Sequence, residues 1–68
     1  MTLYFVSAKN QANGDHEVHT EACGLLPERE HCIELGEFPS CCNAVVAATR
    51  YFPHVDGCFY CCRECHKS

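Results

Sequence analysis

Basic residues are scarce in this sequence of 68 residues. Five lysine and arginine residues stand against nine acidic residues, and the formal net charge is −4 when the histidines are neutral. Proteins that bind nucleic acid generally carry a basic patch or stripe that contacts the phosphate backbone. The sequence disfavours such binding, because its basic residues form no cluster and are scattered at Lys9, Arg29, Arg50, Arg63 and Lys67.

Long hydrophobic runs are also missing. The apolar run near the start covers only residues 3–8, and no basic residue precedes it. It is therefore too short for a membrane span, and it lacks the pattern of a secretory signal peptide. We predict no membrane association and a cytoplasmic location, where thiols stay reduced.

Motifs of catalysis are absent as well. The chain has no paired carboxylates, no nucleophile elbow and no phosphate-binding loop, and 68 residues offer little room for a substrate cleft. We therefore predict that it is not an enzyme. Without internal repeats or a linker, residues 1–68 are predicted to form a single domain. A chain this short buries only roughly 60% of its unfolded surface, so its fold needs a disulfide, a metal or a partner for stability.

Cysteine, in contrast, is abundant, with eight residues, and five histidines accompany it. This cysteine content is typical of a chain held together by disulfides or by metal thiolates. Histidine is a metal ligand but contributes nothing to a disulfide framework, and CxxC spacing suits chelation in a reducing compartment. Both observations favour metal, with disulfides as the alternative.

Two overlapping CxxC pairs lie near the end of the chain, Cys58-x-x-Cys61 and Cys62-x-x-Cys65. The adjacent Cys61 and Cys62 cannot easily serve one ion, so the two pairs compete. Gly57 gives the backbone freedom that a metal knuckle needs, which favours the first pair. A tetrahedral zinc ion takes four ligands, and the upstream His19-x-x-x-Cys23 is the candidate for the other two.

The second choice of ligands is Cys62, Cys65 and His66, which would form a second metal site or, through Cys62 and Cys65, a redox pair.

The other cysteines and histidines have simpler explanations. We predict packing in the core for the remaining cysteines, since cysteine behaves as a small hydrophobe; these are Cys32, Cys41 and Cys42. Solvated positions are predicted for His31 and His54, while His16 is left between solvent and a contact behind the ligands. The aromatic residues are expected to form the core and the wall of the zinc site: Tyr4, Phe5, Tyr51, Phe52, Phe59 and Tyr60.

The pattern of residues predicts an α+β fold. Residues 3–8 and 16–19 have strand character and form a hairpin around Asn13-Gly14, and residues 32–36 make a third short strand that a glycine ends. One main helix covers about 40–52, with Ser40 as its N-cap and Pro53 after its end. Its buried face is predicted to hold Cys42, Val45, Val46, Thr49 and Phe52. Residues 54–57 form a turn, and residues 62–66 a final helical turn. The result is a short antiparallel sheet, one helix and a C-terminal CxxC knuckle.

The order of these motifs resembles the N-terminal zinc domain of the Ada DNA-repair protein and its small relatives. The resemblance covers about residues 16–62: a strand, HxxxC, an extended segment, a phenylalanine before a helix with an early alanine, and a closing CxxC. It implies one zinc ion held by His19, Cys23, Cys58 and Cys61. In the Ada family the first cysteine of a CxxxC pair accepts a methyl group from DNA. His19 stands at that position here and cannot act as that thiolate, so the resemblance implies the architecture and argues against the repair chemistry.

We therefore expect zinc binding by a small structural or interaction domain with one tetrahedral Cys/His site. A protein partner is compatible with such a domain, although the residues do not identify one. Two alternatives are a nucleic-acid-binding module of the Ada type, which the charge disfavours, and a redox or metal-handling protein that uses Cys62 and Cys65.

Overall fold

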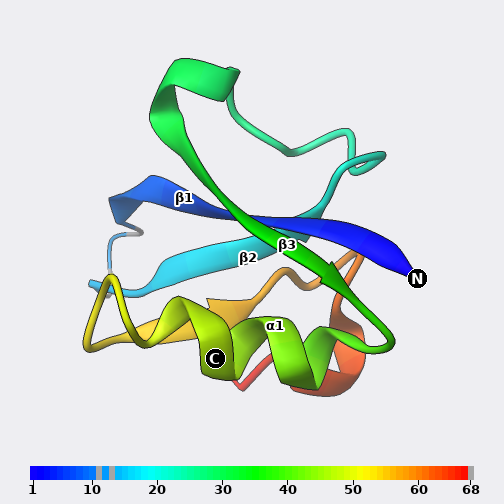
Figure 1. Cartoon of the computed structure of the whole chain (residues 1–68). Coiled ribbons are helices and arrows are strands. Elements are labelled where there is room, and N and C mark those ends of the chain that lie inside the picture. Colours follow the sequence, from blue (N-terminus) through cyan, green and yellow to red (C-terminus); the bar gives the residue numbers. More distant parts are fainter. Residues whose placement is uncertain (11, 13, 68) are drawn as a thin grey trace.

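The computed structural model describes residues 1–10, 12 and 14–67, and they form an α+β fold, as predicted (Figure 1). Four strands, one α-helix and two short 3-10 turns follow one another along this part of the chain. Their bounds are β1 (Thr2–Asn10), β2 (His16–Thr20), η1 (Arg29–His31), β3 (Cys32–Phe38), α1 (Cys41–Ala48), β4 (Val55–Gly57) and η2 (Arg63–Cys65).

The strands form one sheet in the order β3-β1-β2-β4. The strand β1 is central and antiparallel to both β2 and β3, and the hairpin of β1 and β2 confirms the predicted pairing, with Val6 opposite Val18. Of the predicted Asn13-Gly14 turn, Asn13 lies outside the described residues. Gly14 has a φ of +92°, in the left-handed region that glycine enters without strain.

The third strand runs past its predicted end. Gly36 does not terminate it, because β3 continues to Phe38 through an irregularity in its pairing with β1. Tyr4 pairs with Gly36 and Phe5 with Glu34, so one extra residue is accommodated on β3 at this point. The φ of Gly36 is +115°, a conformation that other residues adopt only with strain, which explains a glycine inside this strand.

The segment predicted as a turn at 54–57 contains a strand. Residues Val55–Gly57 form β4, which pairs with β2 in parallel, and the backbone N–H of Cys58 extends the ladder to the carbonyl of Val18 at 3.0 Å. The sheet is therefore mixed, where a purely antiparallel one was predicted. A parallel pair places the ends of β2 and β4 at the same edge of the sheet.

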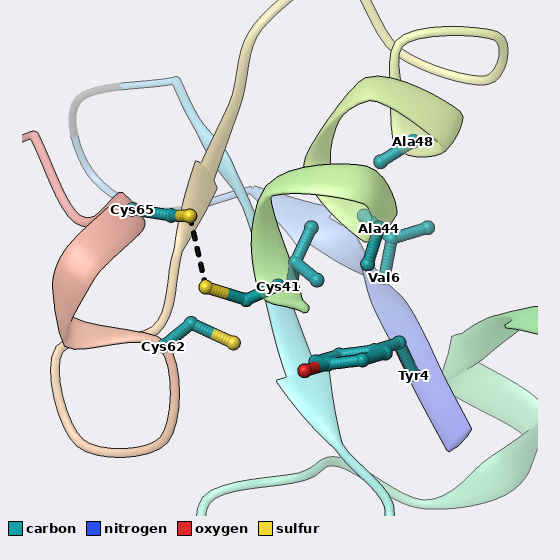
Figure 2. Packing of buried hydrophobic residues seen from close by; sticks show 8 residues of the cluster. Tyr4, Val6, Cys41, Ala44, Ala48, Cys62 and Cys65 are labelled. Carbon is teal, nitrogen blue, oxygen red and sulfur yellow. Dashed lines mark hydrogen bonds between the residues drawn. The ribbon is translucent and has the colours of Figure 1, made fainter. Parts of the chain in front are cut away.

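The hydrophobic core lies between the sheet and α1 (Figures 1 and 2). Val6 and Val18 are fully buried there, and Ala44 and Ala48 of α1 pack against the same cluster. Successive strand residues point to opposite faces, so Phe5 and His19, which pair with each other, lie on the face away from α1. The guanidinium of Arg29, from η1, lies 4.4 Å from the ring centroid of Phe5 on that face.

The helix differs from its prediction in length and in the face that it buries. It ends at Ala48, followed by a turn through residue 51. Its buried residues are Cys41, Ala44 and Ala48, whereas Cys42 is exposed and Val46 is 69% exposed. Small side chains face the sheet because they let the helix approach closely. The predicted face was therefore wrong at Cys42, Val46 and Thr49, which are exposed, whereas Val45 and Phe52 pack, partly buried, against the core.

Two smaller predictions about this region were also tested. Ser40 precedes the helix with the extended backbone of an N-cap, but its hydroxyl donates to Oδ1 of Asn43 at 2.9 Å and caps no backbone N–H. Among the aromatic residues expected in the core, three are exposed: Tyr51, Phe59 and Tyr60.

No helix in the described part of the chain has the length and apolar character needed to cross a bilayer.

Candidate metal centre

One histidine and three cysteines meet at the edge of the sheet where β2 and β4 end. They are His19, Cys23, Cys58 and Cys61, and their ligand atoms all lie within 4.8 Å of one another. These are the four side chains that the sequence nominated, and they come from β2, from the turn after it and from the segment after β4. This group could hold a metal ion.

The local backbone explains how Cys23 returns to the sheet. The N–H of Cys23 donates to the carbonyl of Thr20 at 3.1 Å, which closes a tight turn directly after β2. The turn places Sγ of Cys23 3.9 Å from Sγ of Cys58. Two thiolates around a tetrahedral zinc ion, each about 2.3 Å from it, lie about 3.8 Å apart, so this spacing fits such an ion.

The second ligand pair sits in the loop that follows β4. Cys58 is the first residue after the strand and is fully buried. Its carbonyl accepts the N–H of Cys62 at 2.9 Å, which bends the chain so that Cys61 faces the end of β2. There Sγ of Cys61 accepts the N–H of Thr20 at 3.3 Å, and Sγ of Cys23 accepts the N–H of Leu25 at 3.4 Å. These two hydrogen bonds hold the sulfurs in place at the end of β2.

The imidazole of His19 carries the clearest sign of a ligand. It is 2% exposed, and its Nδ1 is buried without a hydrogen-bond partner. Among the described residues, no other buried side-chain nitrogen or oxygen lacks one. Its Nε2 lies 3.5 Å from a carboxylate oxygen of Glu17, on the same face of β2. A proton on Nε2 that points at Glu17 leaves the lone pair of Nδ1 free for a metal, an arrangement common behind metal-binding histidines.

The surroundings of His19 favour the neutral form of its imidazole, which is the form that binds a cation. Burial lowers the pKa of His19 below its ordinary value, so the imidazole is neutral near pH 7 and offers a lone pair. Burial also raises the pKa of Glu17, an effect that His66 opposes and Asp56 adds to. Asp56 is the register partner of Glu17 on β4, so both carboxylates lie on the face away from α1.

The residues of the second choice do not come together. Cys62 is 1% exposed and packs in the core, with its Sγ 3.8 Å from that of Cys61. Nδ1 of His66 lies 2.9 Å from the carbonyl of Gly57 and 3.3 Å from Oδ2 of Asp56, so it helps to hold the C-terminal segment. The sulfur of Cys65 instead approaches α1, where it meets Cys41 (Figure 2).

Gly57 is required for a different reason from the one predicted. Its φ is outside the positive range, which among the described glycines only Gly14 and Gly36 enter. A Cβ at Gly57 would lie 2.8 Å from the carbonyl oxygen of Cys62 and 2.9 Å from Cβ of Cys65. The missing side chain therefore lets the turn at 62–65 pack directly on β4.

The other predicted positions divide between core and surface. Cys41 is 3% exposed and belongs to the core, Cys32 is half-buried, and Cys42 is exposed, contrary to its predicted packing. His16 stacks on Phe52, with ring centroids 3.7 Å apart. Its Nδ1 lies 2.9 Å from the carbonyl oxygen of Ser7 and donates a hydrogen bond to it, because a carbonyl oxygen can only accept. His54 is exposed and His31 partly exposed, close to the predicted solvation.

Comparisons of the chain with protein-family models, with curated proteins and with solved structures found no match.

Proposed function

We propose that this chain is a small zinc-binding domain in which His19, Cys23, Cys58 and Cys61 hold one Zn²⁺ ion. The observation that carries the proposal is the convergence of these four side chains, with a buried imidazole nitrogen of His19 left without a hydrogen-bond partner. Three thiolates and one imidazole are a donor set that zinc uses in structural sites. The spacing of the sulfurs of Cys23 and Cys58 supports the same ion.

The role of the ion is structural. Four protein ligands complete a tetrahedron and leave no position for a substrate or a reactive water. Binding of zinc to such sites supplies an apparent folding free energy of about 10–16 kcal/mol, which matches the whole stability of a typical domain. For a chain of 68 residues, that contribution is sufficient reason for these ligands.

We infer that the domain is a structural or interaction module and does not catalyse a reaction, because four protein ligands leave the ion no open position for a substrate. The likeness to the Ada zinc domain is part of this proposal, as an architecture in which a zinc ion joins a sheet to a C-terminal CxxC. Histidine at the first ligand position and the net charge of −4 argue against transfer of a methyl group from DNA. We propose a reducing compartment such as the cytoplasm, where the thiols remain available for metal.

Native mass spectrometry and Co²⁺ substitution test the assignment. In the full chain with the single substitution Cys23→Ser or His19→Ala, we expect this site to lose its ion and the thiolate–Co²⁺ absorption that reports it. Cys32→Ser is the matched control, because Cys32 lies outside the group of four candidate ligands. Full retention of the ion in Cys23→Ser would contradict the proposal, as would a mass lower by about 2 Da for each cystine, which would indicate disulfides.

A further inference from the structure

A second group of thiols lies on the opposite side of the sheet, beside α1. Cys41 and Cys42 are the first two residues of the helix, and Cys65 is the last residue of η2. Sγ of Cys65 lies 2.8 Å from Sγ of Cys41 and 2.9 Å from Sγ of Cys42. Figure 2 shows the side chains of Cys41 and Cys65 pointing toward one another. Although Cys41 and Cys42 are adjacent, unlike Cys61 and Cys62 they both direct their sulfurs to one point, the sulfur of Cys65. Three thiols from two segments distant in the sequence thus meet there.

A carboxylate lies beside the three thiols. Oε1 of Glu64 lies 3.3 Å from Sγ of Cys41, although Glu64 is not part of the converging group itself. A carboxylate oxygen is an accepted zinc ligand alongside cysteine, so a modest movement of Glu64 would add one oxygen to the three sulfurs. The group shares no residue with the first centre.

This group is more open to solvent than the first centre, in which Cys23 and Cys61 are half-buried. Cys41 and Cys65 are 3% and 9% exposed, but Cys42 is exposed. A shallow hollow of about 220 Å³ opens over it, lined by Cys42, Val45, Glu64, Cys65 and Lys67. An ion or a competing ligand can therefore approach the sulfurs directly.

We propose that Cys41, Cys42 and Cys65, with Glu64 beside them, form a second, solvent-accessible site for Zn²⁺ or another thiolate-preferring cation. Soft thiolate ligands select such ions over hard cations. The proposal goes beyond the structural zinc site and does not depend on it. Because the thiol of Cys42 is exposed, the ion of this site exchanges faster than the ion of the first centre, where no ligand is exposed.

Two physical requirements of this site can be met. Sulfurs around one zinc ion lie about 3.8 Å apart, so binding must widen the present contacts by about 1 Å. The exposed side chain of Cys42 has room to move into the hollow. Three thiolates and a carboxylate leave a negative charge around a divalent ion, which Lys67 at the rim and the positive end of α1 partly offset.

The test is a Co²⁺ and Zn²⁺ titration of the reduced full chain, followed by native mass spectrometry. We expect two equivalents in the unmodified protein and one in Cys42→Ser, with the absorption of the first, Cys₃His centre unchanged. Because Cys42 is exposed, this substitution leaves the core in place, and Cys32→Ser again serves as the control. A colorimetric chelator should remove the second equivalent at least about tenfold faster than the first.

Three outcomes would overturn the inference: one equivalent in the unmodified protein, two equivalents retained in Cys42→Ser, or a disulfide from Cys65 in protein prepared under reducing conditions. Failure of the structural site gives a different result. In that case Cys23→Ser would bind as much metal as the unmodified chain, whatever the effect of Cys42→Ser.

Discussion

Replacement of Gly57 by alanine tests how the two ends of the fold fit together. The added methyl group would lie 2.8 Å from the carbonyl oxygen of Cys62, 2.9 Å from Cβ of Cys65 and 3.0 Å from Cβ of Cys62. These atoms belong to the backbone or are fixed to it, so no change of rotamer relieves the contacts. Overpacking of this kind destabilises a protein by about 1–3 kcal/mol, and we expect the upper half of that range because main chain must move.

The loss is best measured by urea unfolding of the zinc-loaded protein, followed by circular dichroism at a fixed concentration of free zinc. Gly24→Ala is the control, since a Cβ there meets nothing within 4 Å and the φ of Gly24 is outside the positive range. Both substitutions restrict the unfolded chain alike, so their difference isolates the clash. We expect the free energy of unfolding of Gly57→Ala to lie about 2–3 kcal/mol below that of Gly24→Ala. Stabilities of the two variants within about 0.5 kcal/mol would refute the packing argument.

Three further predictions use other contacts. Burial raises the pKa of Cys62 to about 12, so very little of this buried thiol is ionised at neutral pH. Mass mapping should therefore show slower alkylation of Cys62, which is 1% exposed, than of the half-buried Cys32, and equal rates would contradict this. Because burial lowers the pKa of His19, the unfolded chain takes up its proton first, and the urea midpoint should fall as the pH drops below about 6.5. A midpoint that rises toward pH 5 would oppose this assignment. Asp56→Ala removes the acceptor of the Lys67 N–H at 2.7 Å and should lower the free energy of unfolding by about 1–3 kcal/mol, and an unchanged value would show that the contact is dispensable.

Local sequence signals were sufficient for the hairpin and for the four side chains that converge. The spacing of His19 and Cys23, and of Cys58 and Cys61, fixes each pair within one turn of chain, and the structure brings the two pairs together. The strand that joins them was missed. Residues Val55–Gly57 are too few to show a period, and their conformation depends on parallel pairing with a strand almost forty residues earlier.

The buried face of α1 could not be predicted from the local sequence pattern, for a different reason. The helix α1 carries small or apolar residues of its own on most sides, so the spacing of hydrophobic residues does not select one buried face. The size of the gap between helix and sheet decides, and it admits Ala44 and Ala48 while it excludes Val46. The orientation of α1 that buries Ala44 and Ala48 also brings Cys41 into contact with Cys65. This contact depends on tertiary packing, and the spacing of the cysteines in the sequence does not indicate it.

The parallel pairing of β2 and β4 links the first centre to the closure of the sheet. His19 and Cys23 lie early in the chain, and Cys58 and Cys61 lie beside them where β4 pairs with β2. A growing chain that stops before residue 61 cannot complete the tetrahedron, whatever metal surrounds it. An ion held at all four positions therefore reports that the sheet between them has closed, and cleavage after β4 would remove two ligands at once.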